Sequence, residues 1–138
     1  MMRRGMELEL LLANRPYAQR WLVLSLAVLV LAGFFALAVV ISRMPPFDRW
    51  VTDPLFFKRC LVAHVNLALV AWFYSFVAAL LALGDDGPPS LLARHAIVTA
   101  GAGVVAMLAG AAVPGATPVL ANYVPTIDHW LFQFGQIA

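Results

Sequence analysis

The sequence predicts an all-α fold, a polytopic bundle of transmembrane helices with three complete spans and the start of a fourth. Hydrophobic residues make up 63% of the 138 residues and charged residues only 12%, whereas a soluble domain usually carries about a quarter charged residues. The charges also gather in clusters, so that long runs of the chain carry none. Because about 20 apolar residues cross the hydrocarbon core as a helix, each long run predicts a membrane span.

The predicted organisation has two parts, an N-terminal tail and a transmembrane helical domain. Residues 1–20 mix arginines and glutamates with a short leucine cluster, which is typical of a segment that lies on the membrane surface. Residues 21–138 form the transmembrane domain. We expect its spans at about residues 17–43, 58–84, 91–113 and, incomplete, 129–138.

Helix-breaking residues separate the predicted spans. Pro45 and Pro46 end the first span, a turn sequence at 85–90 ends the second, and Pro114 ends the third. Prolines in residues 115–128 predict a structured loop or a short broken helix. The run that follows offers roughly 15 Å of helix, about half of what a bilayer needs. We therefore expect the chain to be a fragment of something longer.

Charge and cysteine content restrict the partners. The net charge of +2 comes from residues of the tail and loops, without the basic stripe that would follow a phosphate backbone. We therefore expect the lipid bilayer and no nucleic acid as a partner. The single cysteine, Cys60, completes neither a disulfide nor a redox or zinc motif. Lysines and arginines near the span ends slightly favour a cytoplasmic N-terminus in the inner membrane.

His64 is the candidate functional residue, because it lies several residues inside the second span. An ionisable side chain at that depth needs a hydrogen-bond partner, a water-lined path or a metal. On a continuous helix His64 shares a face with small residues, namely Cys60, Ala68, Ala71 and Ser75. Such a face leaves room for a haem, whose iron imidazole commonly binds, but it equally suits plain helix packing.

The other candidate residues have simpler interpretations. Small residues in the third span, namely Thr99, Ala102, Gly103, Ala106 and Gly110, predict close contact with another helix. Met107 in the same span is interpreted as a filler of the packed interior. His95 and His129 flank the later apolar runs beside charged residues, so we expect them at headgroup level.

The order of residues in the second span resembles helix two of haem-copper oxidase subunit I. Residues 59–66, RCLVAHVN, are followed by Trp72 and Phe73, and the likeness is greatest to the cbb3-type oxidases and the nitric oxide reductases. Two further features resemble that family. They are the turn at Met44 and Pro45, and the segment 122–125, NYVP, ahead of a helix that starts at 128–129.

The resemblance implies that His64 is an axial ligand of a low-spin haem b and that Arg59 meets a haem propionate. It implies supporting or packing roles for Asn66 and Trp72. In the family, the second ligand of this haem and the binuclear haem-copper or haem-iron centre come from later helices, which this sequence does not contain. The chain would therefore be the N-terminal part of an oxidoreductase. It would reduce oxygen or nitric oxide only as part of a longer chain or complex. The expected partners are other respiratory subunits, such as a cytochrome c-type subunit.

Two alternatives remain open on the sequence. In one, the chain is a small membrane cytochrome b in which His64 pairs with a histidine of another chain. In the other, it is a membrane scaffold or transporter subunit without haem, in which His64 is a packing or proton-path residue.

Overall fold

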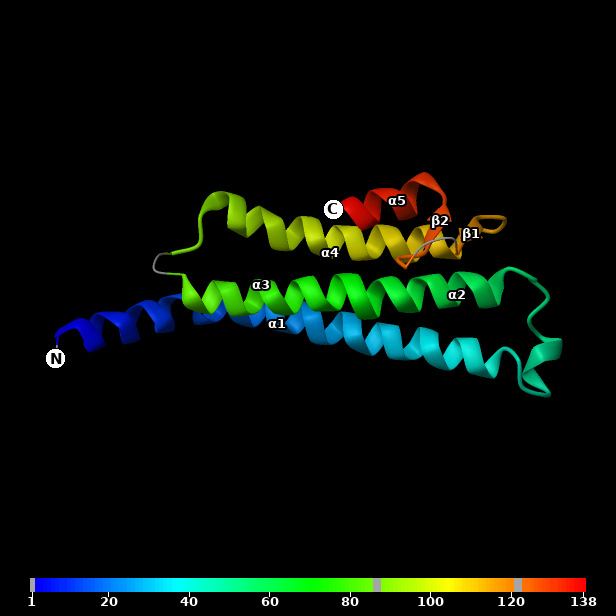
Figure 1. Ribbon diagram of the computed structural model, residues 1–138, viewed down its shortest axis with the longest axis horizontal. Coiled ribbons are helices and arrows are strands. Elements are labelled where there is room, and N and C mark those ends of the chain that lie inside the picture. The colour runs from blue at the N-terminus through cyan, green and yellow to red at the C-terminus, as the bar shows by residue number, and fades with distance from the viewer. Residues whose placement is uncertain (1, 86–87, 121–122) are drawn as a thin grey trace.

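The protein is a bundle of long helices packed side by side, and Figure 1 shows their arrangement. The structure, a computed structural model, describes residues 2–85, 88–120 and 123–138, with side chains described from residue 15. The helices are α1 (Met2–Ile41), α2 (Phe56–Val65), α3 (Trp72–Gly84), α4 (Leu91–Ala112) and α5 (Trp130–Ile137). A π-helical segment, Asn66–Ala71, joins α2 to α3, so that the two form one rod. The predicted all-α transmembrane bundle is confirmed.

Three helical stretches are long and apolar enough to cross a membrane: Arg15–Ile41, Phe56–Gly84 and Leu91–Ala112. Large apolar side chains, such as Leu26, Leu69 and Val105, are exposed on their outer faces. In water such faces would favour aggregation, whereas lipid tails solvate them. The chain is therefore a multi-pass membrane protein.

The first helix is longer than the predicted span. α1 runs without a break from Met2 to Ile41 and contains Pro16, and its N-terminal end projects beyond the other helices (Figure 1). Residues 2–20 thus continue the helix that crosses the membrane. That they lie on the membrane surface stays a prediction.

The turns between spans are built from local contacts. A short 3-10 helix, Phe47–Arg49, follows the paired prolines after α1. The side chain of Ser90 accepts a hydrogen bond from the backbone N–H of Ala93 and so caps α4, because the first N–H groups of a helix lack partners within it. Residues 86–87 of the predicted turn lie outside the described residues.

Residues after α4 form a small hairpin, and the predicted alternative of a short broken helix is wrong here. Strand β1 (Thr117–Val119) pairs antiparallel with β2 (Thr126–Asp128), with Pro118 opposite Ile127. Proline lacks a backbone N–H and favours an extended conformation in the residue before it. These properties explain why Pro118 and Pro125 favour strands over a helix.

Helix α5, which follows the hairpin, lies back along α4, the third span, so that the C-terminus is beside α4 (Figure 1). Helix α5 packs on α4 through three glycines. A Cβ added at Gly135 would lie 2.5 Å from the carbonyl oxygen of Gly103 and 2.7 Å from Met107, and one added at Gly110 would lie 2.6 Å from the backbone nitrogen of Phe132. The predicted close contact of the third span is therefore present.

The contact face of α4 differs in detail from the predicted set of small residues. It runs through Gly103, Met107 and Gly110, all of them buried, whereas Ala102 is exposed. Met107 belongs to the apolar core, in agreement with its interpretation as a filler. That core joins α1, α2, α4 and α5 around Val28, Ala32, Val62, Leu67, Val104, Met107, Ile127 and Phe132.

Candidate functional site

His64 lies in the last turn of α2 and faces α1. Its Nδ1 atom is 2.9 Å from the backbone carbonyl oxygen of Ala32. Because a carbonyl oxygen only accepts hydrogen bonds, Nδ1 carries the proton of this contact. The side chain is half-buried. A histidine that binds a metal usually has this arrangement, with one ring nitrogen donating to a carbonyl and the other free for the metal.

The helix changes its hydrogen-bonding pattern directly after His64. Residues Asn66–Ala71 are π-helical, and a π turn contains one residue more than an α turn. Such segments are rare and are frequently found at functional sites. Nothing in the sequence analysis predicted the segment, because apolar residues fit α-helical and π-helical turns equally well.

The π segment also corrects the predicted face of small residues around His64. One additional residue in a turn rotates everything that follows by about 100° relative to a continuous α-helix. Ala71 and Ser75 therefore do not continue the face of Cys60 and His64. Instead they line a groove between α3 and α4.

Asn66, the first residue of the π segment, is fully buried and uses both ends of its amide. Its Nδ2 donates to the carbonyl oxygens of Val62, at 2.9 Å, and Pro125, at 2.7 Å. Its Oδ1 accepts a hydrogen bond of 2.7 Å from Nε2 of Gln136. Gln136 in turn accepts a 2.6 Å hydrogen bond from the hydroxyl of Thr126. The Asn66 network, defined as these five residues, thus connects the second span to the hairpin and to α5.

The other end of the π segment is held from α1. Ser25 is fully buried, and its hydroxyl donates to the carbonyl oxygen of Trp72 over 3.4 Å. Trp72 is the first residue of α3, and its ring stacks on that of Phe76 with centroids 6.2 Å apart. Together with the contact of His64 to Ala32, this bond fixes the rod α2–α3 against α1 on both sides of the π segment.

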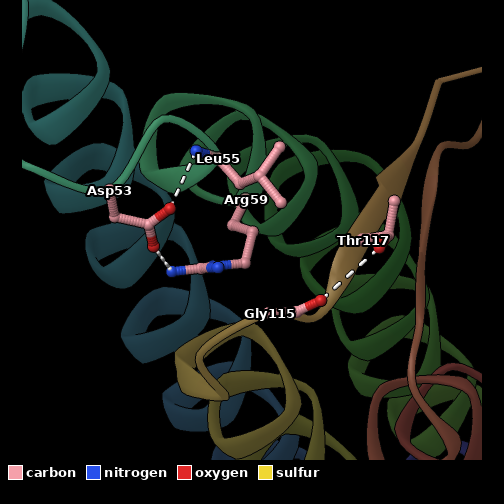
Figure 2. Close-up of polar contacts among 5 residues, drawn as sticks. All are labelled: Asp53, Leu55, Arg59, Gly115 and Thr117. Carbon is pink, nitrogen blue, oxygen red and sulfur yellow. Dashed lines mark hydrogen bonds and ion pairs between the residues drawn. The ribbon is translucent and has the colours of Figure 1, made fainter.

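Arg59 lies one turn into α2, and only 6% of its surface is exposed. Its Nη2 forms an ion pair and hydrogen bond with Oδ2 of Asp53, as Figure 2 shows. The other carboxylate oxygen of Asp53 accepts a hydrogen bond of 2.8 Å from the backbone N–H of Leu55. Nε and Nη1 of Arg59 are buried and have no hydrogen-bond partner among the described residues.

The surroundings of Asp53 stabilise its ionised form. The backbone N–H of Leu55 and, after it, the Arg59 guanidinium lower the pKa of the Asp53 carboxyl group from its ordinary value of 3.8, and their effect exceeds the opposing effect of burial. Asp53 is therefore ionised at neutral pH and compensates part of the buried charge of Arg59.

His64 and Arg59 point to different sides of α2. They are five residues apart, which corresponds to about 7.5 Å along an α-helix and about 140° around its axis. A haem iron would have to bind His64 through Nε2, since Nδ1 contacts the carbonyl oxygen of Ala32. Arg59 fits an anionic group, because two of its buried nitrogens, Nε and Nη1, have no acceptor among the described residues.

The other sequence candidates lie away from His64. His95 is exposed, and its Nδ1 lies 2.7 Å from the carbonyl oxygen of Leu91. His129 caps α5, because its Nδ1 accepts from the backbone N–H of Leu131. Cys60 is buried and free. Within the described part of the chain, no three His, Cys, Asp or Glu residues lie close enough together to hold a metal ion.

Several polar residues of the site were not identified from the sequence. Gln136 and Ser25 carry no signal in the sequence, since a single uncharged polar residue in an apolar run gives no pattern of its own. Asn66 was noted only through the resemblance. Asn122, part of the segment that contributed to that resemblance, lies outside the described residues.

Comparisons with known proteins give one similar chain. An uncharacterized protein of Rickettsia prowazekii (strain Madrid E) is 31% identical over 84 residues, which are 61% of this chain and 16% of that protein. The matched segment thus spans less than a fifth of the relative. No protein-family model matches the chain, and no solved structure matches it.

Proposed function

We propose that this chain is the N-terminal part of a haem-copper-oxidase-like subunit I, in which His64 binds the iron of a low-spin haem b. One observation carries the proposal: His64 lies within a membrane span and donates Nδ1–H to the carbonyl oxygen of Ala32. An intramembrane histidine with one nitrogen held and the other free has the chemistry of an axial ligand. The order of Arg59, His64, Asn66 and Trp72 supports the same family.

In this proposal the residues of the chain hold and tune the cofactor. The bond to the Ala32 carbonyl fixes the tautomer and the ring plane of His64 and raises the basicity of Nε2. Arg59, on another side of α2, would donate from its two unpaired nitrogens, Nε and Nη1, to a propionate. When bound, a low-spin haem transfers single electrons, and burial among apolar helices tunes its potential.

The complete protein would pass electrons toward the reduction of oxygen or nitric oxide. That step requires a second haem ligand and a binuclear centre from outside these residues. The Rickettsia relative, of which the matched segment is 16%, is compatible with a longer subunit of this kind. We place the protein in the inner membrane with a cytoplasmic N-terminus, next to other respiratory subunits such as a cytochrome c-type subunit.

Visible spectra of the purified protein test the proposal. The protein, expressed from its complete gene and purified in detergent, should give a sharp haem b band after reduction with dithionite. We expect His64→Gln to abolish the part of the band that comes from the low-spin haem. His95→Gln is the matched control, because His95 also contacts a backbone carbonyl but is exposed at the start of α4, and its spectrum should equal that of the wild type.

Two results would contradict the proposal. A wild-type protein without haem would exclude both the oxidase subunit and a small cytochrome b, and would leave the scaffold or transporter alternative. A low-spin haem signal that persists unchanged in His64→Gln, in protein that elutes as a single species, would exclude His64 as the ligand.

A further inference from the structure

The Asn66 network lies directly beside the proposed haem ligand, and it connects that ligand to a part of the chain distant in sequence. Gln136 is separated from Asn66 by 70 residues, and Pro125 by 59. Asn66 itself is fully buried. Inside a membrane an amide without partners costs several kcal/mol, so both of its polar atoms need the acceptors and donor that this network supplies.

The network holds a conformation that the local sequence does not favour. π-helical turns are rare, and an unfavourable backbone conformation persists only where the surrounding structure fixes it. Here Asn66 fixes the first residue of the π segment through Val62, Pro125 and Gln136. At the other end, Ser25 donates to the carbonyl oxygen of Trp72, the residue that directly follows the π segment.

His64 precedes this segment by two residues. Its ring is held at Nδ1 by Ala32, but its backbone belongs to the rod whose turn the π segment defines. If the segment relaxed to an α-helix, α2 and α3 would rotate by about 100° relative to each other. With α3 packed against α1, the side of α2 that carries His64 would then turn relative to Ala32.

We propose that Asn66 and Gln136 are positioning residues for His64, which hold the π segment and through it the orientation of the imidazole toward the haem. This inference rests on the proposed function of His64. It assigns the hairpin and α5 a role in the haem site, since Thr126 and Pro125 orient Gln136 and Asn66. Neither residue is assigned as a ligand of the cofactor.

The test compares Gln136→Leu with Gln133→Leu in the complete gene product. Both residues lie in α5, but Gln133 is exposed, whereas Gln136 bonds to Asn66 and Thr126. Two measurements are made: amide hydrogen exchange of residues 64–72 by mass spectrometry, and the low-spin haem signal with its midpoint potential. We expect residues 64–72 to exchange at least about fivefold faster in Gln136→Leu, since loss of a hydrogen bond to a buried amide costs at least about 1 kcal/mol and about 1.4 kcal/mol is a factor of ten. We also expect the midpoint potential to shift.

Gln133→Leu should equal the wild type in both measurements. Unchanged exchange in Gln136→Leu would overturn the inference. Faster exchange with an unchanged haem spectrum and potential would also overturn it and leave the proposed function intact. A wild-type protein without haem would overturn the proposed function, and the positioning role with it.

Discussion

At the scale of single residues, the buried polar side chains of this protein are explained by specific partners. Asn66 bonds to Pro125 and Gln136, and His64 to Ala32. Arg59 has one partner, Asp53, and keeps two buried nitrogens without partners in the described residues. A buried charge is tolerated only where it is paired. The buried charge of Arg59 therefore depends on Asp53 for its compensation.

The pH dependence of stability should reflect this ion pair. The pKa of Asp53 is lower in the folded protein than its ordinary value of 3.8. The stabilisation is therefore complete above about that value and is lost as the pH falls through the lower folded pKa. Thermal unfolding in detergent at pH 7 and pH 3 should show a larger loss of melting temperature for the wild type than for Asp53→Asn. An equal loss in both proteins would contradict the assignment.

A second variant separates pairing from charge. Asp53→Asn leaves Arg59 charged and buried without its carboxylate, and breaking such a pair costs more than replacing it by apolar residues. We expect Asp53→Asn to melt at a lower temperature than the double variant Asp53→Asn/Arg59→Met. Asp48→Asn, a control at an exposed aspartate of the same loop, should melt like the wild type. A double variant less stable than the single one would show that the pair itself stabilises the fold.

At the scale of elements, the close contact of α5 with α4 decides where the hairpin and Gln136 lie. Glycines allow backbones to approach closely in a membrane, where packing rather than the hydrophobic effect holds helices together. Gly110 faces the backbone of Phe132, and Gly103 faces Gly135. Phe132 is fully buried at this contact.

Alanine at one of these glycines should therefore displace α5. In Gly110→Ala the new Cβ would lie 2.6 Å from the backbone nitrogen of Phe132, and overpacking of this kind costs about 1–3 kcal/mol. We expect a lower melting temperature and faster amide exchange in α5. Gly101→Ala is the control in the same helix, because no atom lies within 4 Å of its added Cβ, and it should be neutral or slightly stabilising. Equal effects of the two substitutions would exclude the contact.

At the scale of the whole molecule, three helical stretches able to cross the membrane define a multi-pass protein with exposed apolar faces. The first two spans pack along their whole lengths, while α3 and α4 diverge around a groove of about 750 Å³. His64 is not among the residues of that groove. It instead lies at the contact of α2 with α1.

The spans predict that consecutive turns lie on opposite sides of the membrane. Reporter fusions after Trp50 and after Ser90 should therefore give opposite signals. With the proposed cytoplasmic N-terminus, alkaline phosphatase should be active at Trp50, and green fluorescent protein should fluoresce at Ser90. The reverse pattern would contradict the orientation alone. If both fusions reported the same compartment, the prediction that Phe56–Gly84 crosses the membrane would be contradicted.

The sequence by itself determined the membrane class, the number of spans and the choice of His64, because hydrophobic run length and an ionisable residue inside such a run are local properties. Only the tertiary structure decided how these parts meet. Residues from distant parts of the chain meet around the π segment. They form the hydrogen bonds of Asn66 to Gln136 and of Ser25 to Trp72, and the contact of His64 with Ala32. The physical reason is that buried polar groups must find partners, and a sequence does not specify which distant group supplies them.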